Sequence, residues 1–359
     1  MKISLFTYWF TWRQRPHHLV DIARKMGHTI TVYSNRSVAS FFSLSRYVSY
    51  GQEIKTNLLL PSPRFDRIPG VLKLNSLQRK RLIDDFLGDV PDVHIFAAIP
   101  TEQIRQKPRF LIYDCMDDWS DFPSLPPSVS ANERRLCQMA DRIWVVSEHI
   151  YRKFEADFGA KLEYVPNGVD YAHFYTVPQK KVPRSRPVLG YVGALHSWFD
   201  AELVACVADQ LPEWDVILVG PNMLVPEQQR VLSRPNIHFA GRQPYERVPA
   251  LLAEFDVAMI PFILNDLIKG TSPIKLYEYL AAGIPVVSSS MPEVIPFCQP
   301  GVVACADEPY TFARAVKEMR NTESPAMIQQ RQVVAQQHTW EARFKNALSG
   351  LRTDEREES

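Results

Sequence analysis

Hydrophobic positions along the chain follow two alternating patterns. Short runs of β-branched and aromatic residues are typical of buried strands, whereas longer segments with apolar residues every three or four positions are typical of helices. In the first half, the short runs predict strands over Lys2–Tyr8, Thr29–Tyr33, His94–Ala98, Phe110–Tyr113 and Ile143–Val146. A helix over Pro16–Met26 is expected to end at Gly27, and Ser147 is expected to cap a helix that begins at Glu148. Because strands and helices alternate, we expect a parallel sheet with helices on both faces.

The alternation is interrupted near the middle of the chain and then starts again. Residues 177–187 are rich in Pro, Lys and Arg and have no apolar period, which is typical of a linker between domains. Beyond them, strands are predicted over Val188–Val192, Val216–Val219, Ile237–Ala240, Val257–Ile260 and Val286–Ser289, and late helices over Tyr310–Arg320 and Met327–Gln337. The pattern predicts an α/β protein of two doubly wound, Rossmann-like domains in tandem, with a cleft between them.

The length of the chain agrees with two domains, because 359 residues exceed what one compact core usually serves. We assign residues 1–180 to an N-terminal domain and residues 187–338 to a C-terminal domain. The last segment, 352–359, is mostly charged and is expected to be disordered.

Composition and charge exclude several functional classes. The net charge of +1 gives no global attraction for nucleic acid, which we do not expect as a partner. Residues 1–180 carry 24 basic and 19 acidic residues, and the remainder carries 17 and 21, so the first half is the one suited to an anionic membrane. The five cysteines show no CxxC spacing, so neither a zinc site nor a disulfide framework is expected. No apolar run is long enough for a signal peptide or a membrane span, so we expect a cytoplasmic protein, or one peripheral on the inner face of the membrane.

The segment from Ser272 to Gly283 carries the most specific local pattern. Ser272 is expected to cap a helix, Pro273 to take its first position, and Gly283 to end it in a left-handed conformation. Free amides at the start of such a helix form an anion site together with the helix dipole. Lys275 places a cation in the first turn against the dipole, which indicates a negative ligand, and Glu278 on the same side can accept hydrogen bonds from a ribose diol. The alternative is an ordinary short helix with solvated charges.

Two polar clusters follow strands of the first half, at the sheet edge where ligands bind in open α/β folds. In residues 13–18, Arg15 is a candidate to hold a phosphate bidentately, and His17 is a second candidate. In residues 114–119, Asp117 and Asp118 are candidates to orient an acceptor hydroxyl or to take its proton. The alternatives are a solvated helix start and an Asp-rich turn that caps a helix.

Several short motifs follow one another along nearly the whole chain. Residues 23–32 read Ala-Arg-Lys-Met-Gly-His-Thr-Ile-Thr-Val, residues 140–148 read Ala-Asp-Arg-Ile-Trp-Val-Val-Ser-Glu, and residues 165–170 read Val-Pro-Asn-Gly-Val-Asp. Gly190-Tyr191-Val192-Gly193, then Gly241, Asp256 and Pro261, the 272–283 segment and Trp340-Glu341 follow. In this order and spacing the sequence resembles the GT-B glycosyltransferases, in particular the retaining family-four (group 1) enzymes of bacterial polysaccharide assembly.

The resemblance implies a nucleotide diphosphate sugar as donor and a glycan or lipid-linked acceptor. It implies that Glu278 binds the ribose and that the donor is held by Gly193, Gly241 and the helix start at Ser272, Pro273, Ile274 and Lys275. In the loop after Gly193, His196 and Trp198 are candidates to stack on or bond to the donor sugar, and the alternative is that they only close the loop. It further implies no metal ion and no bound cofactor, and a final helix over 339–351 that returns to the N-terminal domain.

Two departures from the family pattern concern the donor site. The first of the family's two glutamates, which usually touches the donor sugar, falls on Gly270. The Arg and Lys that the family tends to place after the first strand of the second domain are absent from residues 194–200, so phosphate neutralisation is expected from Lys275 and Lys269.

Three alternatives stay open at the level of sequence. An aspartate acting as a base would indicate an inverting rather than a retaining reaction. A sugar-nucleotide epimerase and a non-catalytic binding protein share the same scaffold. A dinucleotide-dependent oxidoreductase is disfavoured, because no GxGxxG follows the first strand.

Overall fold

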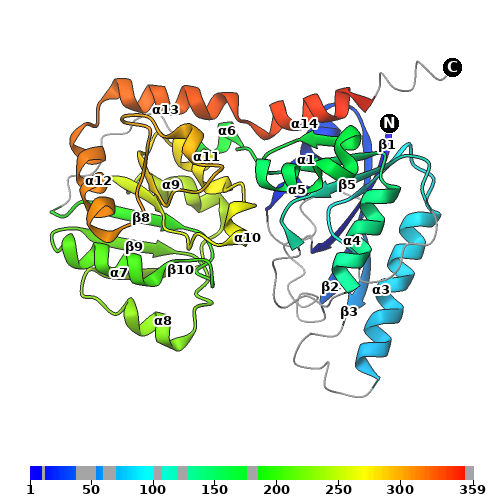
Figure 1. Cartoon of the computed structure of the whole chain (residues 1–359), viewed down its shortest axis with the longest axis horizontal. Helices are drawn as coiled ribbons and strands as arrows, with labels where there is room; N and C mark the ends of the chain where they lie inside the picture. Colours follow the sequence, from blue (N-terminus) through cyan, green and yellow to red (C-terminus); the bar gives the residue numbers. More distant parts are fainter. Residues whose placement is uncertain are drawn as a thin grey trace. The chain divides into compact units, whose positions relative to one another are not determined.

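The computed structural model describes residues 1–9, 13–37, 54–59, 70–100, 107–119, 128–175 and 185–351 (Figure 1). The chain forms two compact units, each with its own parallel sheet. The first comprises Met1–Pro166 and Phe344–Ser359, and the second comprises Asn167–Arg343. The tail 352–359 and most of the expected linker lie outside the described residues.

The first unit is built on a seven-stranded parallel sheet in the order β3-β2-β1-β4-β5-β6-β7. Its strands are β1 (Lys2–Trp9), β2 (Thr29–Ser37), β3 (Ile54–Leu59), β4 (Val93–Phe96), β5 (Leu111–Cys115), β6 (Arg142–Val145) and β7 (Leu162–Tyr164). Its described helices are α1 (Arg15–Lys25), α3 (Val71–Gly88), α4 (Ser128–Met139) and α5 (Glu148–Phe158), with the 3-10 turn η4 (Gly159–Lys161). The order reverses between β1 and β4, so the loops at the carboxyl ends of the central strands form the ligand-binding edge expected of a doubly wound sheet.

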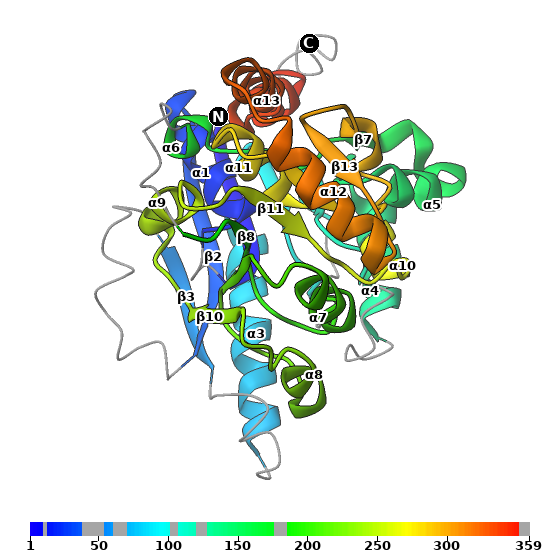
Figure 2. The same cartoon turned by 90° about the vertical axis from the view of Figure 1, so that its left-hand side faces the viewer.

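The second unit repeats this arrangement with six strands in the order β10-β9-β8-β11-β12-β13. Its strands are β8 (Val188–Val192), β9 (Asp215–Val219), β10 (Ile237–Gly241), β11 (Val257–Ile260), β12 (Val286–Ser288) and β13 (Val303–Cys305). Figure 2 shows α7 (Ala201–Gln210) and α12 (Pro309–Asn321) on one side of the strands, and α9 (Val248–Leu252) and α11 (Ile274–Ala281) on the other. The remaining elements are α6 (Tyr171–Phe174), α8 (Pro226–Val231), η5 (Tyr245–Arg247), α10 (Asp266–Lys269), η6 (Ile295–Phe297), α13 (Pro325–Gln337) and the start of α14 (Trp340–Ser349).

The expected fold class is confirmed, since two tandem parallel sheets carry helices between their strands. Strands β8 and β11 have the predicted bounds. The Ser147 cap is also present, because its hydroxyl accepts a hydrogen bond from the Ile150 amide at 3.2 Å. Three strands escaped the sequence analysis: β3, β7 and β13 are edge strands, and the last two have only three residues, too few to show a period.

The division between the units falls after Pro166, earlier than the expected boundary near residue 180. The reason is that the Asn167–Phe174 segment hydrogen-bonds within the second unit. The Val169 amide donates to the His338 carbonyl at 3.0 Å, and the Trp340 amide donates to the Val169 carbonyl at 3.1 Å. Helix α14 starts in the second unit, and its residues from Phe344 onward belong to the first.

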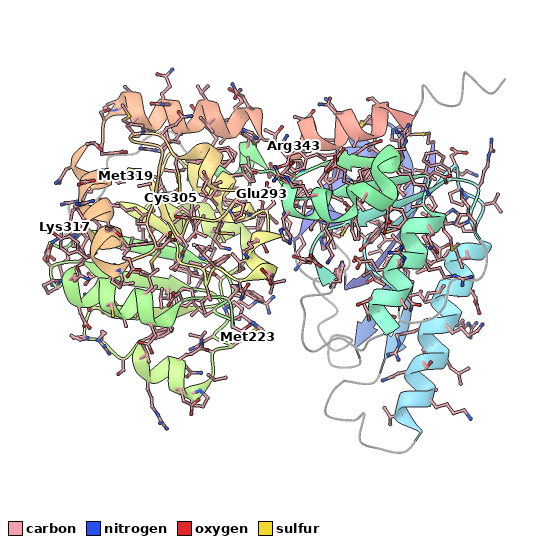
Figure 3. The ribbon with its side chains drawn as sticks, viewed as in Figure 1. Met223, Glu293, Cys305, Lys317, Met319 and Arg343 are labelled. Carbon is pink, nitrogen blue, oxygen red and sulfur yellow. A yellow bond between two sulfur atoms is a disulfide. The ribbon has the colours of Figure 1, made fainter. Side chains whose placement is uncertain are left out.

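Two further observations concern the cysteines and the hydropathy of the helices. Cys298 and Cys305, the latter labelled in Figure 3, form a disulfide, whereas the sequence analysis expected no disulfide framework. The scattered spacing of the cysteines gave no sign of this pair, because the turn through Gln299–Val303 brings them together. Within the described part of the chain, no helix combines the length and hydropathy that a bilayer-crossing segment requires.

Candidate active site

The start of helix α11 lies at the carboxyl edge of the second sheet and differs in one respect from the prediction. The N-cap position is Pro273 rather than Ser272, and no side chain caps the helix. Ser272 is instead held by Asn167. The Ser272 hydroxyl accepts from the Asn167 amide at 3.3 Å, and the Ser272 carbonyl accepts from the Asn167 side chain at 2.8 Å. The role of Asn167 was not foreseen, because the two residues are 105 positions apart.

The missing cap leaves backbone donors unused. The Leu276 amide donates to the Pro273 carbonyl at 3.1 Å, but the amides of Ile274 and Lys275 donate to no described residue. Unpaired amides at a helix start carry the positive end of the helix dipole and suit a phosphate. The predicted anion site therefore keeps its donors, although Ser272 does not cap the helix.

Lys275 extends from this first turn into an aromatic surrounding. Its ammonium nitrogen lies 4.5 Å from the centre of the Phe262 ring and 5.5 Å from that of Tyr191. Burial lowers the pKa of Lys275 to about 8, and the negative charge of Glu278 opposes this only partly. The sequence analysis did not anticipate this role of the two aromatic side chains, of which Tyr191 lies near the end of β8 and Phe262 just after β11.

Glu278 lies one turn further along α11 and is half-buried. Burial raises the pKa of Glu278 to about 7, and the positive charge of Lys275 opposes the rise. Neither side chain forms an ion pair within the described part of the chain. Two ionisable groups with pKa values close to neutrality, and without a fixed partner, are typical of a site whose charges are completed by a ligand.

The loop after β8 approaches Lys275 closely at Gly193. With φ at +153°, a Cβ atom at this position would lie 2.9 Å from the Tyr191 hydroxyl and 3.1 Å from Cε of Lys275. Gly220 follows β9 directly, and a Cβ atom there would lie 1.9 Å from the Gly193 carbonyl. Tyr279 fixes the same edge from α11, because its hydroxyl accepts from the Val192 amide at 2.8 Å. Glycine is therefore required at Gly193 by backbone conformation and by close packing.

The other expected donor-binding residues also lie in the second unit. His196 is in the loop after Gly193, and Gly241 ends β10 with φ at +63°. Lys269 is exposed at the end of α10 and pairs with Asp266 at 2.8 Å. An exposed pair of this kind is weak, so it leaves Lys269 able to exchange partners.

Arg15, the candidate phosphate ligand of the first unit, is occupied in another way. Its guanidinium forms a buried ion pair with Asp114, with nitrogen–oxygen distances of 2.8 and 3.0 Å. It also donates to the Pro166 carbonyl at 3.4 Å and lies 5.0 Å from the ring centre of Phe344. Because Arg15 is only 3% exposed and Asp114 is fully buried, this pair and the Phe344 contact hold the start of α1, β5 and the end of α14 together. His17 is also buried, and its Nδ1 accepts from the Gln14 amide at 3.3 Å at the start of α1.

In the acidic cluster after β5, the carboxylates of Asp117 and Asp118 have different surroundings. Asp118 is buried, accepts a hydrogen bond from the Lys153 ammonium and lies 3.8 Å from Nε2 of His149. Asp117 is half-buried, and burial together with the charge of Asp118 raises the pKa of Asp117 to about 7. Glu133 on α4 accepts from the Tyr113 hydroxyl at 2.7 Å, and its burial raises the pKa of Glu133 to about 7. Glu133 and Lys153 lie on helices without any motif, so only their packing reveals them.

The sequence positions that were expected to act together are thus divided between the units. The donor-binding set lies in the second unit, and Arg15, His17, Asp117 and Asp118 lie in the first. Among the described residues, no three His, Cys, Asp or Glu side chains gather in a way that could hold a metal ion.

Comparison with known proteins places this geometry in a family. Residues 186–321, which contain the α11 site, match the family described as glycosyl transferases group 1. TuaH of Bacillus subtilis, described as a teichuronic acid biosynthesis glycosyltransferase, is 26% identical over 262 residues, which span 66% of each chain. The 2-deoxystreptamine glucosyltransferase of Streptomyces kanamyceticus is 24% identical over 57% of this chain and 58% of its own length. The chain thus spans less than two thirds of the length of these curated relatives.

Solved structures with the same fold cover almost the whole chain. Anabaena HepE, determined in complex with UDP, matches 98% of this chain and 100% of its own, with a TM-score of 0.66 and 14% identity. The sucrose-phosphate synthase of Thermosynechococcus elongatus matches 98% of both chains, with a TM-score of 0.72 and 14% identity. Likeness at this level of identity establishes the fold, and the family match in residues 186–321 adds the sequence relationship. Residues 186–321 are thus similar to the group 1 glycosyl transferases, and the chain as a whole has the GT-B fold.

Proposed function

We propose that the protein transfers a sugar from a nucleotide diphosphate sugar to a glycan or lipid-linked acceptor in cell-surface polysaccharide biosynthesis. The start of α11 carries the proposal, because it offers unpaired amides and a half-buried lysine to an anion, with Glu278 one turn away. The complex of HepE with UDP supports a nucleotide as ligand, and the name of TuaH supports a polysaccharide product.

In this reaction the amides of Ile274 and Lys275, together with the Lys275 ammonium, hold the diphosphate. Glu278 accepts hydrogen bonds from the two ribose hydroxyls. These donors provide positive charge at the leaving group, so we propose that the transfer proceeds without a metal ion.

The bond between the anomeric carbon and the β-phosphate oxygen breaks, and the nucleotide diphosphate leaves with the electron pair. A bond between that carbon and the acceptor oxygen forms on the same face, so we propose that configuration is retained. The acceptor hydroxyl proton passes to the leaving phosphate oxygen, and Asp117 orients the hydroxyl. Asp117 is better suited to this than Asp118, which is tied to Lys153.

We also propose that the first unit contacts an anionic membrane through the N-terminal part of α3. Leu74 and Leu77 are 46% and 57% exposed, and the exposed cations Lys73, Lys80 and Arg81 flank them. This arrangement is typical of helices that lie at a membrane surface. Vesicle flotation tests it: binding should require phosphatidylglycerol, and Leu77→Ser should weaken it. Equal binding to neutral and anionic vesicles would contradict the charge contribution.

Calorimetry with a panel of UDP, GDP, ADP and dTDP sugars tests the proposed donor site. We expect one nucleotide class to bind and Glu278→Ala to abolish that binding, with Glu254→Ala in the exposed turn after α9 as the folding control. Unchanged affinity in Glu278→Ala would reject the assignment. Incubation of the donor without acceptor separates the alternatives, since an epimerase interconverts the donor and a binding protein leaves it intact.

A further inference from the structure

The loop between β8 and α7 contains an aromatic stack that the nucleotide site does not use. The rings of His196 and Trp198 lie nearly parallel, with centres 4.3 Å apart and an interplanar angle of 20°. Both side chains are half-buried. The stack occupies the loop in which the family's pyrophosphate-binding Arg and Lys are absent. The two rings therefore do not take over the positive charge that the family places in this loop.

The loop is fixed to its neighbours on both sides. The Leu195 amide donates to the Pro221 carbonyl at 3.0 Å, and the Met223 amide donates to the Leu195 carbonyl at 2.8 Å. On the other side, the Ile263 amide donates to the Trp198 carbonyl at 2.9 Å. The Tyr191 hydroxyl donates to the Ala194 carbonyl, at the start of the same loop, at 2.9 Å. The stack is therefore held in one orientation before any ligand binds.

His196 is the outer ring of this stack. Trp198 packs against the hydrophobic core of the second unit, so the imidazole on top of it faces away from the core. Nδ1 of His196 is within 3.0 Å of the Ser197 hydroxyl, which leaves Nε2 without a partner among the described residues. A ring whose plane is set by stacking and whose Nδ1 is engaged presents Nε2 in a defined direction.

Tyr191 links this stack to the proposed phosphate site. The Tyr191 ring lies 5.5 Å from the Lys275 ammonium, and its hydroxyl donates to the Ala194 carbonyl, two residues before His196. The lysine and the loop that carries the stack thus contact the same side chain. A sugar joined to a phosphate at Lys275 extends only a few ångströms beyond that phosphate.

We propose that His196, supported by Trp198, contacts the transferred sugar and contributes to the choice of donor. Nε2 of His196 hydrogen-bonds a sugar hydroxyl, and Trp198 acts as a positioning residue beneath the imidazole. The exposed apolar side chains of Met223 (Figure 3) and Ile263 on the two flanking loops contact the C–H groups of the sugar. The inference rests on the proposed donor site, and it supplies a polar contact to the sugar where Gly270 replaces a glutamate.

The test separates sugar recognition from nucleotide recognition. UDP, UDP-glucose and UDP-galactose are titrated into the full chain, followed by kinetics with whichever donor reacts. His196→Ala should leave the affinity for UDP within twofold, raise the KM for the donor roughly three- to tenfold, and reduce the preference between the two epimeric sugars. His196→Gln, which keeps a polar group, should recover part of this loss. Glu202→Gln on exposed α7 is the matched control and should behave as wild type.

The outcomes that overturn the inference differ from those that overturn the proposed function. Equal weakening of UDP and UDP-glucose by His196→Ala would place His196 at the nucleotide, and no change in either would remove it from the site. A change in KM without a change in epimer preference would reject the role in donor choice. If the wild-type chain bound no nucleotide in the wider panel, the proposed function itself would fail, and this inference with it. Thermal unfolding of each variant shows whether a loss reflects misfolding.

Discussion

The pKa of Lys275 leads to a prediction about how nucleotide affinity depends on pH. In the free protein, burial lowers this pKa from 10.5 to about 8, so the ammonium loses its proton between about pH 7 and 9. The fall corresponds to about 3 kcal/mol against the charged form, at ~1.4 kcal/mol per pKa unit. A diphosphate at the start of α11 supplies the missing negative charge, so the pKa of Lys275 should rise on binding.

The expected magnitude follows from proton linkage. If the bound lysine stays protonated throughout, the affinity falls by roughly tenfold from pH 7 to pH 9, because the free protein must take up a proton to bind. Glu278 acts in the opposite sense. Its pKa of about 7 means that it becomes protonated below neutrality and loses its capacity as a carboxylate acceptor for the ribose. Nucleotide affinity should therefore pass through a maximum between about pH 7 and pH 8.

Calorimetry with UDP at several pH values, in buffers of different ionisation enthalpy, measures both the affinity and the protons exchanged. Near pH 8 we expect net proton uptake on binding, since Lys275 takes up a larger fraction of a proton than Glu278 releases. The matched variant is Lys275→Arg, whose guanidinium remains charged across this range. Its affinity should be flat from pH 7.5 to pH 9.

Two results would refute this reasoning. If Lys275→Arg keeps the same alkaline loss of affinity as wild type, the titrating group is not Lys275. If the wild-type affinity is flat between pH 7 and 9 with no proton uptake, the lysine does not meet the phosphate. In either case the start of α11 would lose its strongest support as the diphosphate site.

Three further predictions concern the other residues of the two units. Arg15→Ala should lower the free energy of unfolding by about 3–5 kcal/mol in urea titration, because it leaves the buried Asp114 carboxylate unpaired; a stable but inactive variant would instead indicate a direct catalytic role. Gly193→Ala should cost about 1–3 kcal/mol of stability through backbone strain and should raise the donor KM by displacing Lys275, whereas wild-type stability and KM would show that the loop adapts freely. Asp117→Asn should lower kcat. In the wild type, the pKa of Asp117 near 7 means that the carboxylate becomes protonated below that pH, so kcat should fall there, and this part of the fall should be absent from the variant. An unchanged dependence of kcat on pH would exclude Asp117 from the reaction.

Local patterns predicted the secondary structure more fully than the site. The period of apolar residues was enough for β8 and β11, and capping chemistry was enough for Ser147 and Gly283, which ends α11 with φ at +75°. Both signals depend on neighbours within a few residues. They failed for β7 and β13, because a strand of three residues at a sheet edge has no period to detect.

In the candidate site, too, features set by neighbouring residues were predicted, whereas contacts with distant segments were not. The motif at 272–283 singled out Lys275 and Glu278 as candidates, and among the described residues the amides of Ile274 and Lys275 have no acceptor, as the helix start predicts. The motif misplaced the cap, because whether Ser272 faces the helix or Asn167 depends on a segment 105 residues away. The sequence around Arg15 likewise suggests a guanidinium that can bind a phosphate, but in the fold it pairs with Asp114, 99 residues away.

The sequence by itself determined the two doubly wound sheets and the position of the α11 helix, because periodicity, caps and ordered motifs are properties of short segments. Only the tertiary structure decided which of the polar residues are structural and which remain for a ligand. It paired Arg15 with Asp114, surrounded Lys275 with Tyr191 and Phe262, and stacked His196 on Trp198. These outcomes depend on desolvation and on contacts between distant segments, and both exist only once the chain has folded.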